Sequence, residues 1–147
     1  MTASPNSDAE AKKLPHDAQA SAVANELSSA LKELHRALIR ADIGDDPVLQ
    51  GSPYSALFAL IGDPRFNWME PLSKLIVTID EKVAEKEITG MDMVIELRKQ
   101  AGRLIGEGKE PLPEVFRMHH VMALQKDPEA GLATGRLRKA LAKIAEA

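Results

Sequence analysis

The sequence has no cysteine, so disulfide bonds, cysteine-ligated zinc, iron–sulfur clusters and thiol catalysis are excluded. Aromatic residues make up only 3% of the chain, so its core must be mostly aliphatic, which favours packed helices over a sandwich or barrel. No apolar run approaches the roughly 20 residues that span a bilayer, and the first residues lack the apolar segment of a secretory signal. We therefore expect a cytoplasmic protein without membrane association.

The residues that are present suit one globular domain. Of 147 residues, 44% are hydrophobic and 28% are charged, and the net charge of −3 gives no general attraction to nucleic acid or to an anionic membrane. Residues 1–17 are rich in Ser, Asp, Ala, Lys and Pro and have almost nothing to bury. We expect a disordered N-terminal tail over residues 1–17 and a single helical-bundle domain over residues 18–147.

Apolar residues recur at spacings of three and four, which predicts amphipathic helices. The first predicted helix begins near residue 18 and runs for about six turns. Others are expected over about 53–61, from the first turn at Pro71, over about 92–105 and 113–125, and from Pro128. No segment alternates long enough for a strand. The predicted fold class is all-α, a bundle of about five to six helices with short loops.

Several residues are placed to begin or end these helices. Asn67 with Glu70, and Thr89 with Asp92, have the spacing of capping boxes. Asp127 precedes a proline and is a predicted N-cap, and Gly106 is predicted to end its helix.

The segment FNWMEPLSKLIVTIDE, residues 66–81, holds the only tryptophan of the chain, Trp68. On a helical wheel Trp68 flanks the apolar stripe that follows Pro71. We therefore expect Trp68 to pack inward at the mouth of that helix, with its indole N–H reaching a partner or water. Asp80 lies on the flank of the same stripe, either bonded to a neighbouring helix or solvated. Phe66, Trp68, Asp80 and His119 are the candidate binding residues.

The two adjacent histidines point about 100° apart on a helix, so they cannot hold one metal as an i, i+4 pair would. His119 is predicted on the apolar face of its helix, with Val115, Phe116, Met122 and Ala123. It is either a hydrogen-bonded core histidine or a group with a shifted pKa in a pocket. His120 is predicted on the flank, in contact with solvent. A third histidine, His35, lies at the edge of the first helix's stripe.

Other polar clusters do not match a known type of site. Asp42, Asp45 and Asp46 lack the spacing of a calcium loop, and the segment GEGKE at 106–110 lacks the pattern of a phosphate loop. The last helix is basic, but its first residues offer no base-reading donors, so nucleic acid is an unfavoured partner. We predict no catalytic residues, no metal and no cofactor.

The stretch IGDPRFNWMEPLSKLIVTIDE resembles a family of small, helical bacterial proteins with no assigned activity. The shared pattern is an Asp-Pro, an aromatic residue two positions before a Trp, then Pro-Leu-Ser, an aliphatic run and Ile-Asp-Glu. A weaker similarity covers the segment around Leu124, Gln125, Asp127 and Pro128. The resemblance covers about a third of the chain and implies a bacterial, helical protein; it assigns no site residue.

These observations lead to two functional hypotheses. The first is a non-catalytic helical bundle that binds another protein, or itself, through a helix face. Val77, Leu124 and Leu132 lie off the main stripes of their helices, which leaves apolar surface for a partner. The alternative is a small-molecule-binding or catalytic bundle with a pocket near Trp68 and His119.

Overall fold

The computed structural model describes residues 15–43, 64–107 and 114–145, and in these ranges the chain is helical without strands. The predicted all-α bundle is confirmed. The predicted helix over about 53–61, Asp45, Asp46 and most of the expected N-terminal tail lie outside the described residues. The elements are α2 (Ala18–Ile43), η2 (Pro64–Met69), α4 (Glu70–Ala84), α5 (Met91–Leu104), α6 (Glu114–Lys126) and α7 (Pro128–Ala145).

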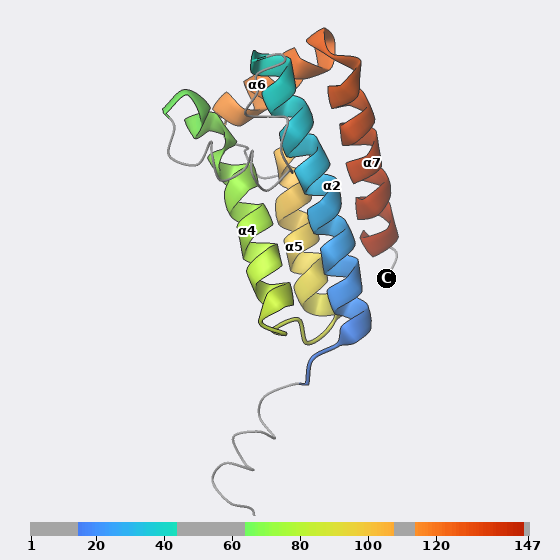
Figure 1. Cartoon of the computed structure of the whole chain (residues 1–147). Helices are drawn as coiled ribbons and strands as arrows, with labels where there is room; N and C mark the ends of the chain where they lie inside the picture. The colour runs from blue at the N-terminus through green and yellow to red at the C-terminus, as the bar shows by residue number, and fades with distance from the viewer. Residues whose placement is uncertain (1–14, 44–63, 108–113, 146–147) are drawn as a thin grey trace, which may run out of the picture.

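Four of these helices run roughly along one axis and alternate in direction, and α6 crosses one end of them (Figure 1). α2 packs against α4, α5, α6 and α7, while α4 and α7 both pack against α5. The first turn of α2 lies beside the α4–α5 connection, because the Asp17 N–H donates to the Ile88 carbonyl over 2.9 Å. α2 is therefore the element around which the bundle is organised.

The core is aliphatic, as the composition predicts. The stripe predicted for the first helix is buried at Leu27, Leu31, Leu34 and Leu38, and half-buried at Val23. α7 buries one face, made of Ala130, Ala133, Leu137, Leu141 and Ile144. Its predicted N-cap is confirmed, because the Asp127 carboxylate accepts the Glu129 N–H over 2.9 Å. Each fully buried leucine contributes roughly 1.5–3 kcal/mol from removal of apolar area from water.

Two predicted capping boxes are wrong. Asn67 lies within the 3-10 turn of η2, and α4 begins after Met69 without a side-chain cap, although Pro71 does stand in its first turn. Thr89 donates through its N–H and its hydroxyl to the Met93 sulfur, so it does not cap α5 either. At α4 the proline removes one of the first-turn N–H donors that a cap would serve, and at α5 the Met93 sulfur accepts the two groups of Thr89 that a capping box would use.

The predicted orientation of α6 is also wrong. Val115 and Met122 are predicted to face the core, but each is 55% exposed. The buried positions are Phe116, His120 and Ala123, so His120, predicted in solvent, is only 2% exposed. Both sets have helical spacing, and the buried set is the one that gives the imidazole a hydrogen-bond partner, the Thr134 hydroxyl on α7.

His35, which was predicted at the edge of the first helix's stripe, is buried in the bundle and 3% exposed. Burial lowers its pKa from 6.5 to about 4, because the charged form loses its hydration. The pKa of His35 is therefore lower in the folded state than in the unfolded state. The neutral imidazole is therefore compatible with folding above pH 6.5, and stability is lost as the pH falls from 6.5 toward 4.

We expect His35→Leu to reduce the loss of unfolding free energy that occurs when the pH is lowered. Over that window the wild type should lose roughly 3 kcal/mol of unfolding free energy through His35, because its unfolded state binds the extra proton. Urea unfolding at about pH 7 and about pH 4.5 measures this, and the variant should lose less between the two than the wild type. Equal losses in both proteins would show that His35 is not the titrating group.

Candidate functional site

The candidate site forms where η2 meets α6. Trp68 of η2 stacks on His119 of α6, with ring centroids 4.1 Å apart and planes 5° apart. The sequence placed both residues among the binding candidates without indicating that they touch. Trp68 is 8% exposed, as expected of an inward-packed residue, and His119 is half-buried. The stack joins η2, which directly precedes α4, to α6, although its two residues lie 51 positions apart in the sequence (119 − 68).

The Trp68 indole has a second neighbour, Phe116, with ring centroids 6.1 Å apart at 45°. Its Nε1–H is buried and has no hydrogen-bond partner among the described residues, so the expected partner is not found there. Phe66, the other aromatic candidate of η2, is buried and bends the backbone with φ −116°. Trp68, Phe116 and His119 therefore form one packed group, with one indole face already covered.

His120 connects α6 to α7 beside the group of Trp68, Phe116 and His119. Its Nε2 lies 3.0 Å from the Thr134 hydroxyl oxygen, which donates its only hydrogen to the Ala130 carbonyl over 2.7 Å. The hydroxyl must then accept from the imidazole, so the proton of neutral His120 is on Nε2. Burial, followed by the charges of Arg138 and Arg117, lowers the pKa of His120. A neutral histidine with this bond is a structural anchor rather than an acid or base.

A shallow groove runs between α6 and the start of α4, beside the stack. Its volume is about 290 Å³, and His119 does not line it because the indole covers the ring. Glu70 and Lys74 at its rim form an exposed ion pair of 2.6 Å. The residues lining it are Asn67, Trp68, Glu70, Pro71, Lys74, Val115 and Phe116.

A second hollow of about 290 Å³ lies between the first turns of α2 and α5 and the last turns of α7. Val23, Leu27 and Ile144 make part of its wall apolar. The carboxylate of Asp17 in this wall already accepts the Ala20 N–H over 2.9 Å and so caps α2. The turns of α2, α5 and α7 that line this hollow lie at the end of the bundle opposite α6 (Figure 1).

Beside the groove, α6 turns an apolar stripe to solvent. Val115, Met118 and Met122, at spacings of three and four, are each 55% exposed, and we name these three residues the α6 outer face. Val115 belongs both to this face and to the groove wall. Leu124 and Leu132 are also exposed, as predicted, whereas Val77 is packed against the core. The sequence signal for the outer face was present as a second helical stripe in α6.

Asp80 does not belong to this site. It follows the first residue of α4 by ten positions, about 15 Å along the axis, and it faces α2. Its carboxylate accepts the Ser28 hydroxyl over 2.5 Å and pairs with Lys32 at 2.9 Å. Both charged side chains are less than one-fifth exposed. Of the two hypotheses for Asp80, the bond to a neighbouring helix is correct, and its role is to join α4 to α2.

Two basic side chains of α7 are engaged within the chain. Arg136 pairs with Glu33 at 3.4 Å, and Arg138 donates to the Ile105 carbonyl at 3.5 Å. Arg117 of α6 lies directly over Gly106, which has φ +91° and ends the α5 turn as the sequence predicted. These contacts attach α7 and α6 to the rest of the bundle and reduce the free cationic surface.

Neither a metal centre nor a membrane span was found in the described residues. No three potential metal-ligating side chains gather in residues 15–43, 64–107 and 114–145. Within the same ranges, every helix is too short or too polar to cross a bilayer. Comparison of the chain with protein-family models, curated proteins and solved structures gives no match. The geometry of the site provides three features, which are an apolar helix face, an aromatic support beneath it and an adjoining groove.

We expect His119→Ala to uncover one face of Trp68 and shift its fluorescence emission to longer wavelength. Because Trp68 is the only tryptophan, the emission reports this site alone. Loss of the stack should also cost about 1 kcal/mol of unfolding free energy. His119→Phe preserves a stacked ring and should keep the wild-type emission. An unshifted maximum in His119→Ala would contradict the stacked arrangement.

We expect Asp80→Ala to lower the unfolding free energy by roughly 1–3 kcal/mol, because it leaves the fully buried Ser28 hydroxyl and the Lys32 ammonium without this acceptor. Chemical denaturation of Asp80→Ala, Lys32→Met and the double variant measures the coupling. A coupling near zero would mean that the ion pair behaves as an exposed one.

Proposed function

We propose that this chain is a non-catalytic helical module that docks on a protein partner through the α6 outer face. The observation that carries the proposal is the stripe of Val115, Met118 and Met122, each more than half exposed on a helix whose opposite side is fixed in the core. Unbranched methionine side chains adapt to the shape of a partner, which suits a docking surface. Exposed apolar side chains that form a contiguous patch on a soluble protein often belong to an interaction site.

The residues that hold the inner side of α6 favour a docking role for the α6 outer face, in addition to the role of α6 in folding. Phe116 and His120 hold the inner side of α6, and Trp68 braces it through His119. The helix backbone is thus held in place before a partner arrives, so little conformational entropy is lost on binding. The groove that begins at Val115 extends the same surface toward Pro71.

The alternative, a small-molecule or catalytic pocket near Trp68 and His119, has weaker support. Drug-sized ligands are bound in concavities of roughly 300–1,000 Å³ that cover most of their surface. The groove of about 290 Å³ is open along its length, and the stack closes His119 off from it. We therefore include the groove in the docking surface. The bacterial and cytoplasmic setting is part of the proposal and rests on the resemblance and the composition.

The double variant Met118→Glu/Met122→Glu should lose the protein partner while remaining folded. Two carboxylates in the centre of an apolar contact should weaken it by more than about tenfold. The unfolding free energy should change by only about 0.5 kcal/mol, because both side chains are exposed. The measurement compares proteins retained from native cell extract by immobilised wild type and variant, with circular dichroism to confirm folding.

Leu132→Glu is the matched control, because it places an acid at an exposed apolar position of α7 outside the α6 outer face. It should retain the same proteins as the wild type. If the double variant also retains them at equal levels, the α6 outer face is not the docking surface.

A further inference from the structure

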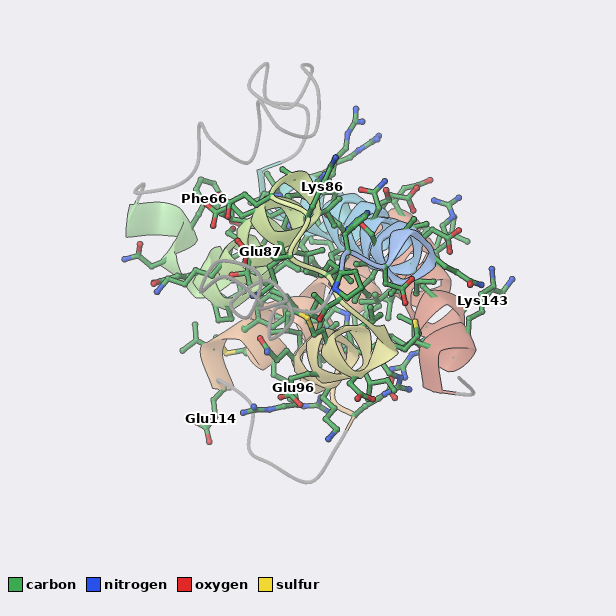
Figure 2. All side chains as sticks on the ribbon, turned by 90° about the horizontal axis from the view of Figure 1, so that it is seen from below. Phe66, Lys86, Glu87, Glu96, Glu114 and Lys143 are labelled. Carbon is green, nitrogen blue, oxygen red and sulfur yellow. The ribbon has the colours of Figure 1, made fainter. Side chains whose placement is uncertain are left out.

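The two ends of α6 carry opposite charges. Glu114 lies in the first turn and Lys126 in the last, and both are exposed. Neither forms an ion pair within the described part of the chain. Figure 2 shows the Glu114 side chain projecting away from the bundle, at the edge of the molecule. The apolar outer face is thus bounded by one acidic and one basic group, both available to a partner.

This pattern is self-complementary when two copies of α6 lie antiparallel. A two-fold axis level with residue 120 sets Met118 opposite Met122 of a second copy. The same axis brings Glu114 level with Lys126 of the second copy at one end of the contact, and Lys126 level with Glu114 of the second copy at the other end. A parallel arrangement would instead bring the two acidic ends together and the two basic ends together. Antiparallel packing also opposes the two helix dipoles, which adds to the preference.

We infer that the partner of the α6 outer face is a second copy of this chain, bound antiparallel across a two-fold axis. The inference rests on the proposed function and names its partner. The interface is isologous, because each copy presents the same apolar stripe and the same pair of charges. α6 has 13 residues and is about 20 Å long, so the contact is smaller than the roughly 1,600 Å² of a standard interface. The dimer is accordingly weak and depends on protein concentration.

The test uses charge reversal in the full chain, measured by sedimentation equilibrium at low salt over a wide range of concentrations. Glu114→Lys alone and Lys126→Glu alone each place like charges together at both ends of the homodimer. Each should weaken dimerisation by roughly tenfold. An equimolar mixture of the two variants should form a heterodimer of about wild-type affinity. At one end of this heterodimer the introduced lysine faces the introduced glutamate, and at the other end the unchanged Lys126 faces the unchanged Glu114.

Weakening by each single reversal together with restoration in the mixture is specific to the antiparallel register. In a parallel pair a single reversal exchanges one pair of like charges for another and leaves the affinity unchanged, and a contact elsewhere responds to neither change. Glu87→Lys and Lys143→Glu are matched controls on the α4–α5 turn and on α7, and Figure 2 places both residues away from Glu114. Both controls should dimerise like the wild type. If single reversals have no effect, or the mixture stays as weak as its components, the antiparallel register is wrong.

The outcome also separates this inference from the proposed function. A wild type that is monomeric at every concentration would overturn self-association. The docking proposal would then stand only if Met118→Glu/Met122→Glu still abolished retention of a different protein. A dimer that the double methionine variant leaves intact would overturn the inference, because it would place the contact outside the α6 outer face, and the docking proposal would again depend on retention of a different protein.

Discussion

Leu27, Leu31 and Leu34 of α2 have no exposed surface, and the burial of this stripe is the constraint on which the other helices depend. α4, α5, α6 and α7 all pack against α2, so each finds its position by covering part of one 26-residue helix. With few aromatic rings, the core gains its stability from many aliphatic contacts, each worth little alone. Polar contacts then fix the orientation of individual helices. The Ser28–Asp80–Lys32 group does so for α4, and the His120–Thr134 bond does so between α6 and α7.

The exposure of the proposed docking surface is a consequence of that arrangement. Four helices along one axis can cover one another's apolar stripes, whereas α6 crosses their end and, among the described elements, packs mainly against α2, α7 and η2 (Figure 1). α6 is apolar on more than one side, so crossing the end leaves Val115, Met118 and Met122 uncovered. The Trp68–His119 stack lies at the boundary between its covered and uncovered sides. The exposure of the proposed docking surface therefore follows from the topology of the bundle.

The sequence predicted the helices that have a single apolar stripe. In α2 and α7 only one orientation hides the stripe, and the structure has that orientation. The helix starts were less predictable. Asn67 and Thr89 fit the sequence pattern of a capping box, but Asn67 lies within η2 and Thr89 bonds to the Met93 sulfur instead. The pairing of Trp68 with His119 could not be predicted, since it depends on how far α6 lies from η2 after the chain has passed through two intervening helices.

The misassigned orientation of α6 and its proposed function have the same physical cause. Periodicity can choose the inner side of a helix only when one side is more apolar than the others. In α6 the stripes through Phe116 and through Met118 are both helical and both apolar, and the imidazole of His120 decides between them because it requires the Thr134 hydroxyl. The other stripe remains apolar although it faces solvent. A helix with two competing stripes leaves one of them in water unless a partner covers it, so the ambiguity in the sequence is itself an argument for the proposed docking surface.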